Sequence, residues 1–294
     1  MAELTALGFG ILTASILALA AVGFTVQFSV TNILNLAYGD VMTGAAFVAY
    51  VASSRGLGGW WGLVFGGLFG AVFSLALNRL IYTPFIRRGA GLFTMIIVTI
   101  AVSLILQNLM QAIWGPGFFS LHIPAGASVH ALGMALTESQ LVVVAIAIVA
   151  MIALHSMLSF TRLGKAMRAT ASDPELARNC GIRTGRVTDI AWLISGLFCG
   201  LAGVALVVDF GSFQSTTGGA FLVPIVAAAV LGGVGQPYGA ILGALVVGIV
   251  SELSATVIDP AYKDVTAFLV LIVVLLIRPQ GIISEVATSK AVAA

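Results

Sequence analysis

Apolar runs long enough to cross a bilayer recur along almost the whole chain. A transmembrane helix needs about 20 mainly apolar residues, and eight segments come close to that length. They are residues 7–27, 32–54, 59–80, 92–113, 139–160, 189–208, 239–256 and 264–278. The charged fraction of 8% and the mean hydropathy of +1.13 agree with this pattern. The sequence therefore predicts an all-α, polytopic membrane protein in which residues 1–294 form a single transmembrane domain.

One further apolar piece, residues 221–231, is too short to cross comfortably. It leads into the Gly/Pro-rich run 231–239, which predicts a turn. The pattern fits either a re-entrant segment or a half-helix that takes part in a crossing. A crossing would put the C-terminus inside, and a re-entrant segment would put it outside.

The basic residues fix the orientation, because Lys and Arg accumulate in cytoplasmic loops. Nine of the thirteen lie in or beside two loops, residues 81–91 and 161–188, so both loops are expected inside and the N-terminus outside. Four tryptophans fall near predicted span ends and are expected at the membrane interface. They are Trp60, Trp61, Trp114 and Trp192.

The loop 161–188 contains two predicted helical pieces. In the first, Arg162, Lys165 and Arg168 recur three apart on one helical face, and we expect this piece to continue the preceding span into water. The second is a short helix from Pro174 to Cys180, bounded by helix-end signals on both sides.

The residues at both ends of that short helix match known helix-capping preferences. Asp173 is a good N-cap, Pro174 suits the first helical position, and Glu175 favours the positive end of the helix dipole. Gly181 supplies the left-handed stop. A helix of about two turns is not stable alone in water. Either its own spans hold it, or a soluble partner does.

Polar residues inside predicted spans are costly and therefore candidates for a translocation pathway. One group is Asn32, Asn35, Tyr38 and Asp40, at the inner end of the second span. Partial unwinding there would let the amides line a path, whereas helix capping and interhelical hydrogen bonding are the structural alternatives. A second pair, Gln107 and Asn108, lies in the fourth span, where interhelical hydrogen bonds are again the alternative.

Several function classes find no support in the sequence. A phosphate-binding loop needs GxxxxGK[ST], but at the nearest approach Ser159 replaces the first glycine and Ala166 follows Lys165. No paired aspartates, HExxH or Ser/His pair falls at span depth, so no catalytic residue, metal ligand set or cofactor is predicted. The net charge of +2 gives no reason to expect nucleic acid. Energy for active transport would have to come from another polypeptide.

Three stretches resemble branched-chain amino acid ABC transporter permeases of the H-type (LivH-like) subunit. Residues 161–182 (TRLGKAMRATASDPELARNCGI) resemble the family's cytoplasmic loop, with Leu176 where alanine is usual. Residues 32–40 (NILNLAYGD) resemble its INFAHG segment, with Tyr38 where histidine is usual. Residues 227–243 resemble its AAVLGGxG…GAxLGG segment. The likeness covers roughly residues 7–285.

The resemblance implies a coupling helix that docks in a groove of an ATP-binding subunit. The implied coupling residues in this sequence are Arg162, Lys165, Arg168, Asp173, Glu175, Ala177, Arg178 and Gly181. It further implies two cytoplasmic ATP-binding subunits, a second permease chain of the M type, an external solute-binding protein, and a multi-pass location in the bacterial inner membrane. The cargo would be a branched-chain amino acid or a related small polar solute. A self-sufficient secondary carrier or channel is the alternative, with Asp40 as its candidate ion-coupling group.

Overall fold

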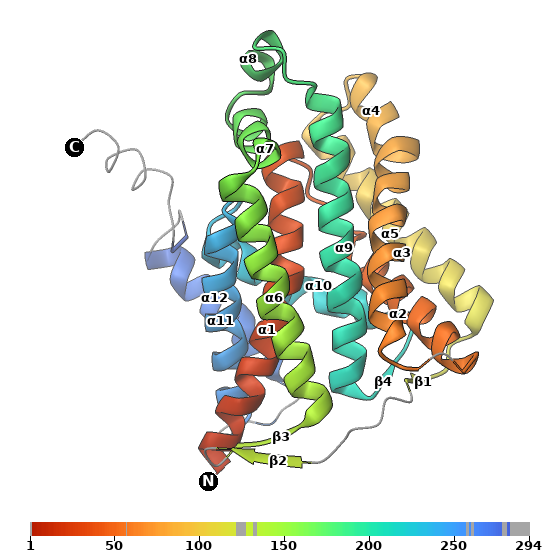
Figure 1. Ribbon diagram of the computed structural model, residues 1–294, viewed down its shortest axis with the longest axis vertical. Helices are drawn as coiled ribbons and strands as arrows, with labels where there is room; N and C mark the ends of the chain where they lie inside the picture. Colours follow the sequence, from red (N-terminus) through yellow and green to blue (C-terminus); the bar gives the residue numbers. More distant parts are fainter. Residues whose placement is uncertain are drawn as a thin grey trace.

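The computed structural model describes most of the chain. The described residues are 2–56, 58–121, 128–131, 134–256, 259, 262–277 and 281–282. They form a bundle of helices with α8 at one end and the N-terminus at the other (Figure 1). Within these ranges, six helices are long and apolar enough to cross a membrane.

The helical elements follow the predicted order closely. They are α1 (Ala2–Thr31), α2 (Tyr38–Ser54), α3 (Trp61–Leu77), the π-helical turn η1 (Asn78–Tyr82), α4 (Thr83–Arg87), α5 (Leu92–Trp114), α6 (Glu138–Phe160), α7 (Arg162–Ser172), α8 (Pro174–Asn179), α9 (Thr184–Phe210), α10 (Thr217–Gly232), α11 (Pro237–Ser254) and α12 (Lys263–Ile277). The predicted helical membrane fold is confirmed. The third span is longer than expected, because η1 and α4 extend it to Arg87.

Within the described ranges, four short strands accompany the helices at the end opposite α8. β1 (Phe119–Ser120) pairs with β4 (Ser212–Phe213), and β2 (Ser128–Ala131) pairs with β3 (Met134–Thr137), both antiparallel. They lie in loops next to the span ends (Figure 1). They close the outer ends of α5, α6 and α9 without forming a layer of their own.

The second crossing is helical only in part. Asn32 has φ of 53° and ends α1, and residues 32–35 are not helical, so α2 begins at Tyr38 and not at residue 32 as expected. Tyr38 Oη donates to the Ala20 carbonyl at 3.0 Å, in the middle of α1. Cys199 Sγ lies 3.2 Å from the Tyr38 carbonyl, in the middle of α9. The helix α2 therefore starts at mid-depth of the bundle and fills only its outer half.

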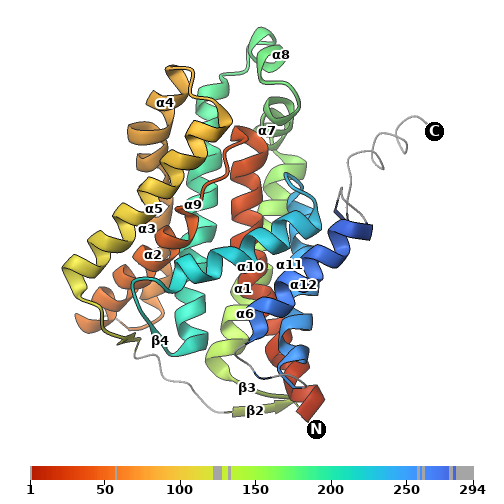
Figure 2. The ribbon, with the colours of Figure 1, turned by 180° about the vertical axis from the view of Figure 1, so that it is seen from behind.

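The segment around α10 has the reverse arrangement. The chain leaves the outer end of α9, passes β4, and begins α10 at Thr217, next to Gly39 of α2. The turn after α10 brings Gly235 beside Ser29, near the inner end of α1. The helix α10 thus lies obliquely across the bundle, from its junction with α2 at mid-depth toward the start of α11 (Figure 2). It is a half-helix within a crossing, because α11 then returns to the outer end.

Small residues let the central helices approach closely. A Cβ on Gly70 of α3 would clash with the Gly196 carbonyl of α9, and Gly62 of α3 faces Ala49 of α2. Such contacts are the usual basis of helix packing where lipid removes the hydrophobic driving force. The predicted interfacial position of Trp192 is wrong: its side chain is fully buried and stacks on Tyr82, with ring centroids 5.1 Å apart.

Candidate functional site

The corner between α6 and α7 is tightly built. Thr161 is the N-cap of α7, and its Oγ1 accepts from the Gly164 amide at 3.1 Å. A Cβ on Gly164 would clash with the backbone of Leu158, and the Arg168 guanidinium donates to the Leu158 carbonyl at the end of α6. The chain therefore turns at Thr161, and α7 does not continue the preceding span as expected. Arg168 stabilises this corner through its bond to Leu158. Arg162 and Lys165 are exposed, as Arg168 is.

Both ends of α8 carry the predicted caps. Asp173 Oδ1 accepts from the Glu175 and Leu176 amides, each at 2.9 Å, and Pro174 occupies the first turn. At the other end the Ile182 amide donates to the Ala177 carbonyl and the Gly181 amide to the Arg178 carbonyl, each at 3.0 Å, with Gly181 at φ of 85°. This is a Schellman stop. The helix is a rigid unit that ends at Asn179, one residue earlier than expected.

The exposed surface of α8 is mixed apolar and charged. Ala177 is buried on the side that faces the bundle, whereas Leu176 is 60% exposed. Glu175 and Arg178 are also exposed. The helix projects beyond the rest of the bundle at its end (Figure 1). An exposed leucine framed by opposite charges suits a docking contact better than a solvated loop.

The structure brings the two basic loops to the same end of the bundle. A cavity of about 1050 Å³ lies between α4, α8 and α9. Its lining includes Arg79, Arg87, Arg88, Arg178, Arg183 and Arg186. Arg79 pairs with Asp189 at 2.7 Å, which ties η1 to α9. By the bias of Lys and Arg toward the cytoplasm, the α8 end is the inner end.

Asn35 and Tyr38 belong to a buried polar network. Asn35 is fully buried, its Nδ2 donates to Gln27 Oε1 at 3.4 Å, and its Oδ1 accepts from Tyr82 Oη at 3.1 Å. Ser195 Oγ also donates to Gln27 Oε1, at 3.3 Å. These bonds join α1, the 32–37 segment, η1 and α9. In this conformation Asn35 and Tyr38 hold helices together.

Asp40 and Gln107 converge where α2 meets α10. A Cβ on Gly219 would lie 3.4 Å from Asp40 Oδ1 and 2.8 Å from Gln107 Nε2. Asp40 is 1% exposed, and its carboxylate interacts with the side chains of Ser103 and Gln107 of α5. Of the other predicted pathway residues, Asn32 is exposed at the end of α1, and exposed Asn108 bonds to the Leu104 carbonyl of its own helix at 2.7 Å.

Two residues of this central region were missed from the sequence. Gln27 stands at the end of the first predicted span, where a polar residue is unremarkable, yet it is fully buried. Thr43 Oγ1 accepts from the Gly218 amide at 2.9 Å and lies 3.3 Å from the Gly39 carbonyl, so it joins the two half-helices. Only the length of α1 could have indicated from the sequence that Gln27 is buried. Nothing in the sequence around Thr43 indicates that it joins the two half-helices.

Broken crossings that meet at mid-depth, together with a capped helix that projects from the inner end, are typical of a transport permease of the helical membrane class. The chain belongs to the family described as the permease component of the branched-chain amino acid transport system, whose model matches residues 6–275. The localisation as a multi-pass membrane protein is thereby confirmed.

Individual relatives agree with this assignment over nearly the whole chain. The high-affinity branched-chain amino acid transport system permease protein LivH of Escherichia coli K12 is 31% identical, over 96% of this chain and 95% of the relative. The corresponding permease BraD of Pseudomonas aeruginosa is 29% identical over the same shares. A solved metal-chelate type ABC transporter in an inward-facing conformation matches with a TM-score of 0.50 and 17% identity, over 91% of this chain and 85% of that one. That structural likeness concerns the fold alone.

Proposed function

We propose that this chain is the permease subunit of an importer that carries a branched-chain amino acid, or a closely related small polar solute, toward the cytoplasm. Its partners would be two ATP-binding subunits, a second permease chain of the M type and an external solute-binding protein. Family membership supports the class of cargo. The observation that carries the coupling role is the exposed, doubly capped helix α8.

The geometry of α7 and α8 suits the transmission of movement. Asp173 ends α7 and caps α8, so the two helices share one rigid joint. The Gly164 and Arg168 contacts with Leu158 lock α7 to α6, and α8 is followed after only four residues by α9. Movement of α8 by a bound ATP-binding subunit would therefore tilt α6 and α9 together.

The coupling residues divide into two roles under this proposal. Leu176, Glu175 and Arg178 would contact the ATP-binding subunit, since they are exposed on α8. Exposed Arg162 and Lys165 would extend that surface along α7. The geometry of α7 and α8 would be maintained by Asp173, Ala177, Gly181 and Arg168.

The pathway would pass the junction of α2 and α10. Helix N-termini carry partial positive charge and attract carboxylates, and here two of them meet at mid-depth beside Asp40. An amino acid carries both a carboxylate and an ammonium group. The helix N-termini suit the first group, and Asp40 with Gln107 suits the second. Asn35 and Tyr38 would line the route only if α2 moves away from α1.

Co-purification with the ATP-binding subunits tests the coupling role. We expect Glu175→Arg, and replacement of residues 174–181 by a Gly/Ser linker, to reduce co-purification of the ATP-binding subunits and solute uptake together. Glu138→Gln, at the outer end of α6, is the matched control and should change neither. Undiminished association and uptake in both altered chains would contradict the proposal.

A further inference from the structure

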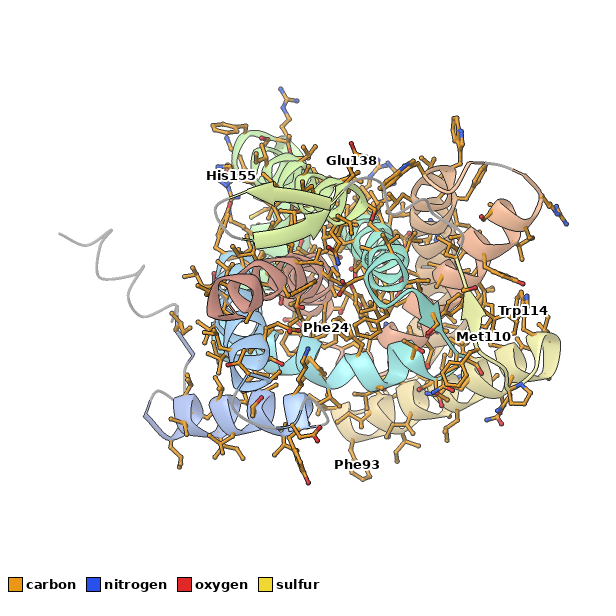
Figure 3. All side chains as sticks on the ribbon, turned by 90° about the horizontal axis from the view of Figure 1, so that it is seen from below. Phe24, Phe93, Met110, Trp114, Glu138 and His155 are labelled. Carbon is orange, nitrogen blue, oxygen red and sulfur yellow. The ribbon has the colours of Figure 1, made fainter. Side chains whose placement is uncertain are left out.

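A second cavity, of about 530 Å³, lies in the outer half of the bundle between α1, α10, α11 and α12. Small-molecule sites commonly measure roughly 300–1,000 Å³. Seen from the outer end, α12 and α5 lie beside α10 on one side of the bundle (Figure 3), and residues of α10 and α12 line the cavity. Its volume is sufficient for one amino acid.

An ion pair forms the polar wall of this cavity. Lys263 Nζ donates to Glu252 Oε1 at 2.8 Å and to Glu252 Oε2 at 2.7 Å. Thr13 Oγ1 donates to Glu252 Oε1 at 3.1 Å. The Glu252 side chain is 14% exposed and that of Lys263 is 36% exposed, so the carboxylate is largely shielded and the lysine remains accessible. Charges in such a setting interact more strongly than in solvent.

The remaining walls are mainly apolar. Leu17, Phe221 and Val247 contribute hydrocarbon surface to the lining. Pro224 in α10 has no amide hydrogen to donate to the Ala220 carbonyl, and both residues line the cavity. That carbonyl therefore lacks its usual helical partner and remains an acceptor. Thr217, in the first turn of α10, adds a hydroxyl next to the junction with Asp40.

We propose that this cavity is an outer binding site for a zwitterionic amino acid with an aliphatic side chain. The ammonium group of the amino acid would bind Glu252 and its carboxylate would bind Lys263, each replacing half of the existing ion pair. The aliphatic side chain would lie against Leu17, Phe221 and Val247. The proposal rests on the proposed function and adds the place where cargo is held before it reaches the α2–α10 junction.

When the amino acid replaces the ion pair, every charge keeps an opposite charge beside it. A zwitterion therefore fits the site, and a singly charged solute does not. A zwitterion leaves both Glu252 and Lys263 paired with an opposite charge. An amine without a carboxylate would leave Lys263 unpaired, and an acid without an amine would leave Glu252 unpaired. The site should accordingly select leucine, isoleucine and valine over leucinamide and N-acetylleucine.

The alternative is that the ion pair only joins α11 to α12. Two kinds of variant separate the alternatives. Glu252→Gln and Lys263→Gln remove charges of the pair, whereas Ala220→Phe fills the cavity and leaves the pair intact. Ala220 is exposed, so the added ring requires no repacking of a core. Glu138→Gln and Ala153→Phe, both at exposed positions of α6, are the matched controls.

The test is equilibrium binding of leucine to the full permease–ATPase complex in lipid nanodiscs, with thermal melting of each variant measured in parallel. We expect Glu252→Gln and Lys263→Gln each to weaken leucine binding by about tenfold or more, the loss expected for one charged hydrogen-bonded contact. Ala220→Phe should also weaken binding, because the ring occupies the space that leucine needs. Both controls should bind as the unaltered complex does. N-acetylleucine and leucinamide should fail to compete.

Leucine affinity unchanged in both Glu252→Gln and Ala220→Phe would overturn the proposal. If Glu252→Gln and Lys263→Gln melt at lower temperatures than the unaltered complex, the result for Ala220→Phe alone decides. Weakened leucine binding with normal assembly supports the site, and unchanged binding overturns it. Failure of the proposed branched-chain cargo is distinguishable, because the unaltered complex would then take up no leucine, isoleucine or valine, whereas failure of this site alone leaves that uptake in place.

Discussion

Gly39 and Gly218 lie backbone to backbone at the point where α2 and α10 begin. A Cβ on either glycine would clash with the carbonyl oxygen of the other, and Thr43 bridges the same two turns. The contact lets two helix N-termini share one position at mid-depth of the bundle. This close contact is therefore required for the two helix N-termini to meet on the candidate pathway.

Gly218→Ala should separate these two helix ends. The added methyl group has no room against the Gly39 carbonyl, and overpacking of this kind costs about 1–3 kcal/mol. We expect a lower melting temperature for the purified complex and slower uptake. Gly185→Ala is the control, because a Cβ there meets nothing within 4 Å. Equal melting temperatures for the two variants would contradict the close contact.

Asp173→Ala should weaken the link between α7 and α8. Loss of a helix N-cap costs about 0.5–2 kcal/mol, and α8 is too short to tolerate that cost alone. We expect ATP hydrolysis to continue with reduced solute uptake. Asp173→Asn keeps a good N-cap acceptor and should behave almost as the unaltered chain does. Uptake reduced equally in both variants would show that the charge, and not the cap, matters.

Asn35→Leu should destabilise the protein. The change leaves buried Gln27 and Tyr82 without the bonds that Asn35 now provides, and an unsatisfied buried polar group costs about 1–3 kcal/mol. We expect a lower melting temperature and incomplete assembly. Asn108→Leu, at an exposed position, should melt normally. Normal stability of Asn35→Leu with impaired uptake would instead place Asn35 on the pathway in this conformation.

Asp40→Asn should impair uptake and leave assembly intact. Asparagine keeps a side-chain oxygen that can accept from Ser103 or Gln107, so the fold should tolerate removal of the charge. We expect uptake to fall by about tenfold, as for loss of one contact to a charged group. The measurement is initial-rate uptake at several solute concentrations. Unaltered rates at every concentration would remove Asp40 from the pathway.

The local features of this fold could be predicted from the sequence, and the long-range ones could not. The caps of α8 are readable because Asp173, Pro174 and Gly181 act on neighbouring amides and carbonyls. The corner at Thr161 was missed because it depends on Gly164 meeting Leu158, a contact that no hydrophobic pattern encodes. The burial of Trp192 and Gln27 was missed for the same reason.

The candidate pathway was predicted only in part. Polar side chains are costly to place inside a membrane, and this reasoning singled out Asp40 and Gln107. The structure brings these two side chains together. The same arguments grouped Asn32 and Asn108 with them, although both are exposed. Their positions depend on where α1 ends and on how α5 is rotated, and the sequence pattern specifies neither.

ATP-driven leucine uptake into proteoliposomes is the decisive test of coupling through α8. The vesicles would contain the full complex with its solute-binding protein, either unaltered or with residues 174–181 replaced by a Gly/Ser linker. We expect the unaltered complex to accumulate leucine only when ATP is supplied, and the linker complex not to accumulate it. Equal accumulation by the two complexes, or accumulation without ATP, would contradict this coupling.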